Sequence, residues 1–321
     1  MKTLFRNFIG ICWILSIFSF FPSAFAADVK FATIGTGTPG GTFYVLGVGM
    51  ADVVNKNLKG FKTTAITTGG ALENLRLLGD GKISVGMSNI RSHSKAYLGQ
   101  KPFDKSFKDI RKGFCIGTYV FHVVTKEKTG IRTIYDLKGK TVSLGTSGSI
   151  GYAVGKYLLK LHGIDIKEIK VRYINPAESV DALIDGMIDA FATFSALPGP
   201  AVNAFAARKR VVLVTADRKK LDQAQSIEKY SSFTVPARTY KGQDEDVPAL
   251  AVVGTADFNK KDSTDFVYQI TKTIIENTAF LKRVHPIGGK VRLLSAEESE
   301  ISPVPFHPGI LKYAKEVGIK Y

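Results

Sequence analysis

Cysteine is scarce in this chain, and its scarcity excludes a fold stabilised by disulfides. The 321 residues contain two cysteines, Cys12 and Cys115. Cys12 lies in a segment that we expect to be removed, which leaves Cys115 without an intramolecular partner. Cys115 stands in the apolar run "GFCIGTYV", so we expect it in a buried strand, where a free cysteine packs as a small hydrophobe. The remaining chain of about 295 residues must be stabilised by its apolar core, most simply as two lobes.

Long hydrophobic runs are also rare, and we find one at the N-terminus only. Lys2 and Arg6 precede the apolar run 8–21, and the sequence then reads A-F-A at 24–26. This order is typical of a cleaved secretory signal peptide, the alternative being an N-terminal membrane anchor. No later stretch reaches the roughly 20 apolar residues of a membrane helix. We predict a signal peptide over residues 1–26 and a periplasmic protein.

Motifs for metal binding and nucleophilic catalysis are missing as well. The chain has five histidines, at positions 93, 122, 162, 285 and 307. None belongs to an H-E-x-x-H or H-x-x-E-H pattern. The segment "GTSGSIG" resembles a serine elbow, but Ser149 stands where G-x-S-x-G requires its closing glycine. We predict no enzyme, no metal and no cofactor. A periplasmic hydrolase acting on a small anionic substrate is the alternative.

Acidic residues are in deficit. The chain has 44 Lys and Arg against 28 Asp and Glu, a formal net charge of +16, which becomes +14 without Lys2 and Arg6. A basic protein attracts anions. The basic residues are scattered, however, and no Lys/Arg run alternates with aromatics as in nucleic-acid-binding proteins. We predict no nucleic-acid partner, which leaves a basic soluble surface and attraction of a small acidic ligand as interpretations.

Short β-rich runs alternate with helical periods along the chain. Strand-like runs stand at 29–35, 62–68, 83–89, 140–146, 170–174, 187–194 and 210–216. Over 42–58, apolar residues recur three or four apart, as on one face of a helix. The repeated order of strand, glycine turn, helix and strand predicts an α/β fold with a mainly parallel sheet flanked by helices.

Two long extended segments, 114–131 and 232–254, stand where the chain would pass from one lobe to the other and back. We therefore predict that 27–120 plus 237–321 form lobe I and that 121–236 form lobe II. Two crossing segments make a hinge, and a hinge between α/β lobes makes a cleft. An assembly or adhesion protein, the third class considered, needs no such hinge.

A glycine-rich loop follows the first predicted strand. Gly35, Gly37 and Gly40 have the G-x-G-x-x-G spacing of a dinucleotide-binding loop. Such a site also needs an acidic residue about 20 positions further on, at the end of the second strand. That strand ends in T-T-G-G at 67–70, and the nearest acid, Glu73, already lies in the next helix. The missing acid argues against a dinucleotide.

Similar turns recur at 69–71 and 147–149. Each places backbone N–H groups and the positive end of a helix at the carboxyl end of a strand, where open α/β sheets bind ligands. If both lobes face the cleft with these ends, the turns converge on an anion site. The alternative is that the glycines merely make tight turns.

Five segments give a more specific resemblance. They are "ATIGTGTPGGTFYVLG", "TTGGALENLRLLGDG", "ALIDGMIDAFATF", "YSSFTVPARTYKGQDEDVPALAVVG" and "VPFHPGILKYAKEVG", in this order. Together they resemble the TAXI subfamily of solute receptors for tripartite ATP-independent periplasmic (TRAP) transporters, from about Phe31 to the end. The resemblance implies a two-lobed periplasmic binding protein, type II-like, that passes a small organic acid to TRAP integral membrane subunits. Glutamate-like dicarboxylates are familiar ligands of that family, and nothing in the sequence requires more than a monomer.

The resemblance also implies ligand contacts in three loops. The glycine–tyrosine loop contributes Gly41, Thr42 and Tyr44. The double-glycine turn contributes Gly70 and Asn74, and the second-lobe loop contributes Gly148 and Ser149. Four residues depart from the usual family pattern, namely Ala71, Ile150, Gly151 and Tyr152. We therefore expect a ligand other than glutamate.

Three further residues are candidates for ligand binding because they follow strands at the predicted cleft. Arg91 follows the third strand, where its guanidinium would clamp a carboxylate with two parallel hydrogen bonds. Its alternative is a solvated arginine at a helix start. Phe194 and Ser195 follow the strand segment "MIDAFAT", where the strand ends of the second lobe would open on the cleft. Phe194 would pack against an apolar part of the ligand or simply within the core.

Overall fold

The computed structural model describes residues 29–147, 149–228 and 230–321. The predicted signal peptide, with cleavage near Ala26, lies outside these residues, as does Gly148. Within the described ranges, no helix combines the length and the apolar character needed to cross a bilayer.

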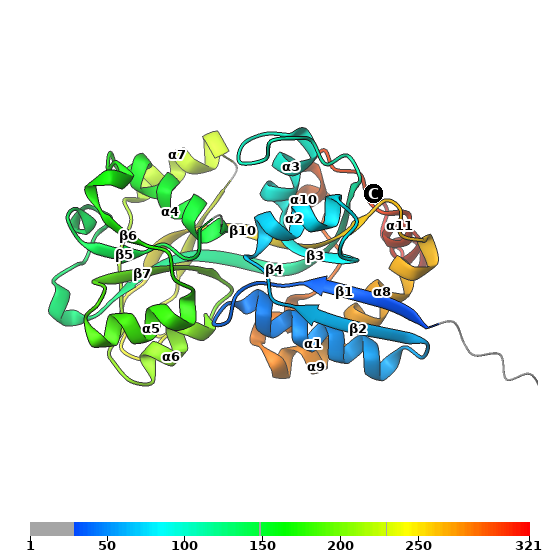
Figure 1. Ribbon diagram of the computed structural model, residues 1–321, viewed down its shortest axis with the longest axis horizontal. Helices are drawn as coiled ribbons and strands as arrows, with labels where there is room; N and C mark the ends of the chain where they lie inside the picture. Colours follow the sequence, from blue (N-terminus) through cyan, green and yellow to red (C-terminus); the bar gives the residue numbers. More distant parts are fainter. Residues whose placement is uncertain (1–28, 148, 229) are drawn as a thin grey trace, which may run out of the picture.

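One sheet runs through both halves of the molecule (Figure 1). Its strands are β1 (Lys30–Gly35), β2 (Phe61–Ile66), β3 (Val85–Asn89), β4 (Ile110–Thr125), β5 (Thr141–Ser143), β6 (Lys170–Arg172), β7 (Ala190–Ser195), β8 (Val212–Leu213), β9 (Ser231–Val235) and β10 (Val247–Asn259). They lie in the order β2-β1-β3-β10-β4-β7-β5-β6, with β8 beside β4 and β9 beside β10. We call the half with β1–β3 the first lobe and the half with β5–β7 the second lobe.

Helices cover both faces of each half of the sheet (Figure 1). They are α1 (Thr42–Asn57), α2 (Ala71–Gly79), α3 (Ile90–Leu98), α4 (Ile150–Leu161), α5 (Pro176–Asp185), α6 (Pro200–Ala206), α7 (Arg218–Glu228), α8 (Thr264–Glu276), α9 (Thr278–Val284), α10 (Ala296–Glu300) and α11 (Pro308–Glu316). In the first lobe, α2 and α3 lie on one face and α1, α8 and α9 on the other. In the second lobe, α4 and α7 lie on one face and α5 and α6 on the other.

The predicted α/β, two-lobed fold class is confirmed. In the first lobe β1 pairs in parallel with β2 and β3, and in the second β5 pairs in parallel with β6 and β7. The first lobe takes its elements from both ends of the chain. Helix α1 buries Leu46, Met50 and Val54 completely, as its apolar period predicts. Each such side chain contributes about 1.5–3 kcal/mol by leaving water.

Cys115 is also where the sequence places it. It is a free, buried residue of β4, and burial raises the pKa of its thiol to about 11. A thiol that stays protonated at neutral pH is unreactive.

The two crossing segments differ from their predicted extents. The first is β4, which begins at Ile110 and ends at Thr125, and a turn closed by Gly130 at φ 70° follows it. The second, predicted as one extended segment over 232–254, is a hairpin in which Val235 of β9 faces Val247 of β10. The intervening turn is stabilised by the buried Gln243, which donates to the carbonyl of Pro236.

The lobes are connected by a pair of adjacent antiparallel strands. β10 runs along β4 from Asn259 opposite Ile110 to Ala251 opposite Val120. Because both strands pass through both lobes without a break, the lobe boundaries at 120/121 and 236/237 stay a prediction.

Candidate functional site

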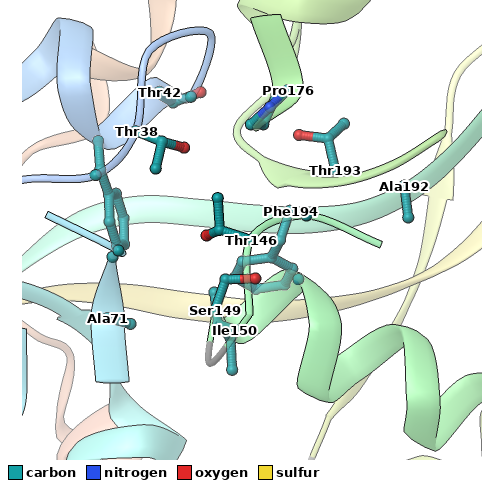
Figure 2. A pocket seen from close by; sticks show the side chains of 17 residues that line it. Thr38, Thr42, Ala71, Thr146, Ser149, Ile150, Pro176, Ala192, Thr193 and Phe194 are labelled. Atoms are coloured by element: carbon teal, nitrogen blue, oxygen red, sulfur yellow. The ribbon is translucent and has the colours of Figure 1, made fainter. Parts of the chain in front are cut away.

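A cavity of about 550 Å³, including its solvent-open side, lies between the two lobes (Figure 2). Its lining residues are Gly37, Thr38, Gly41, Thr42, Phe43, Gly69, Gly70, Ala71, Gly145, Thr146, Ser149, Ile150, Gly151, Pro176, Ala192, Thr193 and Phe194. Figure 2 shows first-lobe side chains, such as Thr38 and Thr42, across from the second-lobe Thr146 and Thr193.

Helix N-termini of both lobes meet at this cavity. The lining includes the first residues of α1, α2, α4 and α5, namely Thr42, Ala71, Ile150 and Pro176. The first N–H groups of a helix have no intrahelical partner and carry a partial positive charge. The cavity is therefore surrounded by four positive helix ends.

Two of these helix ends carry no side-chain cap. The N-caps of α1 and α2 are Gly41 and Gly70. Gly70 has a φ of 97°, a conformation that favours glycine. By contrast, the side chain of Ser149 caps α4 by accepting from Tyr152 N, and Asn175 caps α5. The first amides of α1 and α2 thus have no acceptor from an N-cap side chain, while the Glu73 carboxylate accepts from Gly69 N, just before α2, at 2.6 Å.

The side chains around the cavity are uncharged, as far as the described residues go. The polar ones are hydroxyls, and the hydroxyl of Thr42 is buried and without a hydrogen-bond partner. An unpaired buried hydroxyl costs about 1–3 kcal/mol unless something bonds to it. Phe43, Phe194 and Ala192 supply apolar walls. The cavity thus combines neutral donors with an apolar lining.

The lobes touch each other around the cavity. Ala201 N of α6 donates to Gly40 O of the first lobe over 3.2 Å. A Cβ on Gly40 would lie 2.7 Å from the backbone nitrogen of Ala177 in α5. At a second contact, the Pro198 carbonyl accepts from Nε2 of His285 at 3.0 Å. These contacts join the two lobes.

Five of the residues predicted from the sequence line this one cavity. They are Gly41, Thr42, Gly70, Ser149 and Phe194. They come from three turns and one strand end that lie far apart in the sequence, so the structure brings the glycine turns together as the repeated strand–turn–helix order suggested.

Four other predicted residues lie outside its lining, and Gly148 is outside the described residues. Tyr44 is half-buried on α1, whereas its neighbour Phe43 reaches the cavity. Ser195 is buried at the end of β7, one residue beyond Phe194. The remaining two, Asn74 and Arg91, make contacts within the protein.

The buried amide of Asn74 connects the middle of β3 with the loops that follow β1 and β2. Its nitrogen donates to Thr36 O at 2.6 Å and to Met87 O at 2.8 Å, and its oxygen accepts from Thr68 Oγ1 at 2.7 Å. Asn74 therefore positions the loops that form the cavity.

Arg91 on α3 reaches across to the other lobe. Its guanidinium donates to the hydroxyl of Tyr230 over 2.7 Å and lies 4.1 Å from the centre of that ring. Burial lowers the pKa of Arg91. The pair is a contact between lobes beside the cavity.

Sequence reasoning missed several lining residues, including Thr38, Phe43, Thr146, Thr193 and Pro176. A signal existed for Pro176, because Asn175-Pro176 with Glu178 is a helix-start pattern directly after a predicted strand. Thr193 lies beside Phe194, but only the sheet's orientation shows that it faces the cavity. Ser149, in the segment that resembles a serine elbow, uses its side-chain oxygen to accept from Tyr152 N as the cap of α4.

Comparison with known sequences identifies the family. The sequence pattern of the NMT1-like family matches residues 34–318. The chain belongs to the NMT1-like family. Among solved structures, this NMT1-like protein is similar to a protein of Bordetella bronchiseptica RB50, with a TM-score of 0.56 and 14% identity over 91% of this chain and 99% of that one.

Two further similar structures belong to proteins whose function is described. One, reported for glutathione import via GshT and the cystine ABC importer TcyBC of Streptococcus mutans, gives a TM-score of 0.51 and 11% identity over 84% and 99% of the chains. The periplasmic aliphatic sulphonate binding protein SsuA from Escherichia coli gives 0.49 and 14% over 90% and 88%. At such identities the likeness shows the fold alone. It agrees with a two-lobed binding-protein fold and does not single out the TAXI subfamily.

Proposed function

We propose that this NMT1-like protein is an extracytoplasmic solute receptor, which binds a small organic acid between its lobes and delivers it to a membrane permease. One observation carries the proposal. Two uncapped helix N-termini and the unpartnered hydroxyl of Thr42 border a single interlobe cavity. The helix N–H groups and the Thr42 hydroxyl can donate hydrogen bonds into the cavity, and an ionised carboxylate only accepts hydrogen bonds.

The physics favours an anion although no charged side chain is needed. A negative group at a helix N-terminus gains about 0.3–1 kcal/mol, and up to about 2 kcal/mol where the site is partly buried. Charge-assisted hydrogen bonds from amides and hydroxyls add about 1.5–3 kcal/mol each. The similar structure reported for glutathione import is described with uptake and not with hydrolysis, which supports a receptor over a hydrolase.

Thr42→Val tests the site directly. The variant removes the cavity's buried hydroxyl, so we expect the Kd for a bound acid to rise about tenfold to a hundredfold, measured by isothermal titration calorimetry. Thr271→Val is the matched control, because Thr271 on α8 also has a buried hydroxyl without a partner but lies outside the cavity. Equal effects of the two substitutions on Kd would contradict the assignment.

A thermal-shift screen of monocarboxylates, dicarboxylates, keto acids, sugars and amines tests the ligand class. Binding to the closed form alone raises the free energy of unfolding by about 2.7 kcal/mol at a hundredfold excess over Kd. We expect shifts with acids. Shifts with sugars or amines alone would overturn the anion site.

We further propose a TRAP permease as the partner, because the sequence segments quoted above resemble TAXI receptors. The Streptococcus relative is described with an ABC importer instead. Uptake of the identified ligand by spheroplasts supplied with purified receptor separates the two. We expect uptake to stop when an uncoupler removes the ion gradient with ATP maintained. Uptake that stops only on ATP depletion would indicate an ABC partner.

A further inference from the structure

An aromatic side chain lies behind the apolar walls of the interlobe cavity. Tyr119 on β4 is outside the cavity lining, but its ring contacts two residues that belong to it. The ring centre lies 4.7 Å from that of Phe43, edge to face, and 6.2 Å from that of Phe194, in a stacked arrangement. Aromatic pairs attract each other at such distances. Because Phe43 belongs to the first lobe and Phe194 to the second, Tyr119 joins the apolar walls of the two lobes.

The sheet holds the Tyr119 ring in place. Tyr119 lies opposite Val252 of β10, and a Cβ on Gly254 would lie 2.5 Å from Cε2 of the ring. The ring therefore packs directly on the backbone of Gly254. Since β4 and β10 are the strands that connect the lobes, the ring is fixed to that connection.

The ring of Tyr119, and not its hydroxyl, makes these contacts. The side chain is 1% exposed, and its hydroxyl has no hydrogen-bond partner among the described residues. A buried hydroxyl without a partner destabilises the fold. The contribution of Tyr119 therefore comes from its position between Phe43 and Phe194.

We infer that Tyr119 is a positioning residue for the apolar part of the ligand. It holds Phe43 and Phe194 as one aromatic surface across both lobes, and the ligand is an organic acid whose apolar body lies on that surface. This inference rests on the proposed function, whose ligand class it narrows.

The ligand class follows from how the cavity is divided. The acid group of the ligand occupies the helix ends and the Thr42 hydroxyl, and the rest of it faces Phe43, Ala192 and Phe194. A polar group against these three side chains loses its hydration without gaining a partner. An apolar group gains affinity there, about fourfold for each buried methylene group.

Propanoate and hexanoate test the inference by calorimetry, because they share the carboxylate and differ by three methylene groups. We expect the native protein to bind hexanoate at least tenfold more tightly than propanoate. In Tyr119→Leu, we expect this ratio to fall below threefold, because Phe43 and Phe194 lose the ring between them. The Kd for propanoate should change less than threefold, since the helix ends and Thr42 remain.

Two further variants separate positioning from a general loss of stability. Tyr119→Phe keeps the ring and removes the unpartnered hydroxyl, so the native ratio should persist. Tyr313→Leu is the matched control, because Tyr313 on α11 is also a buried tyrosine packed against another ring, that of Tyr268, but lies outside the cavity. We expect Tyr313→Leu to lower the melting temperature and to leave the ratio within threefold of the native value.

Gly254→Ala gives a second measurement that leaves Tyr119 in the chain. The added methyl group would displace the Tyr119 ring, so the ratio should fall in this variant too. Melting temperatures show which variants are folded, and Gly254→Ala decides the outcome where Tyr119→Leu does not fold.

The outcomes separate the two proposals. A ratio below threefold in the native protein, or a native ratio in the folded variants of Tyr119 and Gly254, would overturn the role of Tyr119 and leave acid binding intact. Loss of the ratio in Tyr119→Phe would assign the effect to the hydroxyl and overturn the role of the ring. A native protein that binds no acid in the thermal-shift screen would overturn the proposed function, and the inference with it.

Discussion

Hydrogen bonds in the folded chain explain the role of individual residues in the segments that resemble TAXI receptors. Tyr240, in the segment "TYKGQ", is buried, and its hydroxyl accepts from Gly199 N over 2.8 Å and lies 3.1 Å from Nε2 of His122. Gly199 is the N-cap of α6, whose Ala201 contacts the first lobe. The Tyr240 hydroxyl thus fixes a helix start at the lobe interface.

Tyr240→Phe should therefore destabilise the fold. The substitution leaves the Gly199 amide and the His122 ring without partners, which costs about 1–3 kcal/mol in the free energy of unfolding. Urea denaturation measures the difference. Tyr135→Phe, on an exposed ring, is the control and should change stability by less than about 0.5 kcal/mol. A Tyr240→Phe protein as stable as the native one would contradict the assignment.

Sequence reasoning at this scale found the glycine turns but not every role. Gly41, Thr42 and Gly70 were predictable because strand–glycine–helix turns have a local signature. The structural role of Asn74 was not, because its partners lie in or just after three strands that the sequence does not show to be adjacent.

At the scale of elements, the turn before α1 works as a contact surface between lobes. Gly40 has a φ of 81° and lies against the backbone of Ala177 at the start of α5. A side chain there meets backbone, which does not move aside easily. Closure of the lobes therefore depends on the absence of a Cβ at one position.

Gly40→Ala should weaken ligand binding beyond its effect on stability. Both Gly40 and Gly60 have positive φ, 81° and 76°, so alanine at either position costs about 1–2 kcal/mol of backbone strain. A Cβ on Gly60 meets nothing within 4 Å, which makes Gly60→Ala the matched control. We expect a Kd increase of about tenfold for Gly40→Ala, from the 1–3 kcal/mol that overpacking costs, and none for Gly60→Ala. Similar Kd values in the two variants would contradict a role for Gly40 in closure.

At the scale of elements, local sequence patterns predicted most helices and strands but not all of them. The helix periods and most strands were predicted to within a few residues. The segment 232–254 is a hairpin, and its turn contains Pro236 and Gly242, the latter at φ 88°. These turn signals were present in the sequence, but the prediction of one extended segment did not use them.

A single sheet runs through the whole molecule, and the sequence did not predict that this sheet is continuous. β4 and β10 pair although more than 120 positions separate them, for example Ala251 and Val120. Local periodicity predicts that each segment is extended, but not that they lie adjacent. The number of lobes and their mixed chain origin were nonetheless deducible from the order of elements.

Stability should fall with acidity between pH 7 and 5. Burial lowers the pKa of His162, His285 and His307, and lowers that of His122 to about 4. Below about pH 6.5 the unfolded chain binds protons at these histidines and the native protein does not, so the free energy of unfolding decreases as the pH falls toward the folded-state pKa values. Asp262 acts oppositely, because burial raises its pKa to about 6 and its contribution is lost as the pH rises through that value.

Urea unfolding at pH 7, 6 and 5 measures the balance of these effects. A fully shifted histidine contributes about 1.4 kcal/mol per pH unit, and four histidines outweigh one carboxylate. Ordinary ion-paired carboxylates lose their effect below about pH 4.5 and so lie outside this window. A stability that stays constant or rises from pH 7 to 5 would show that the histidines are protonated in the folded state.

The uncharged lining of the interlobe cavity has a consequence for where such a receptor can work. Peptide dipoles are fixed by the covalent chain, cannot be titrated, and within a closed cleft are poorly shielded by dissolved ions. A fully ionised acid bound by Thr42 and the amide groups of α1 and α2 is therefore held with similar strength in dilute or saline, neutral or mildly acidic surroundings. That independence suits the proposed receptor role, in which the ligand arrives from outside the cytoplasm.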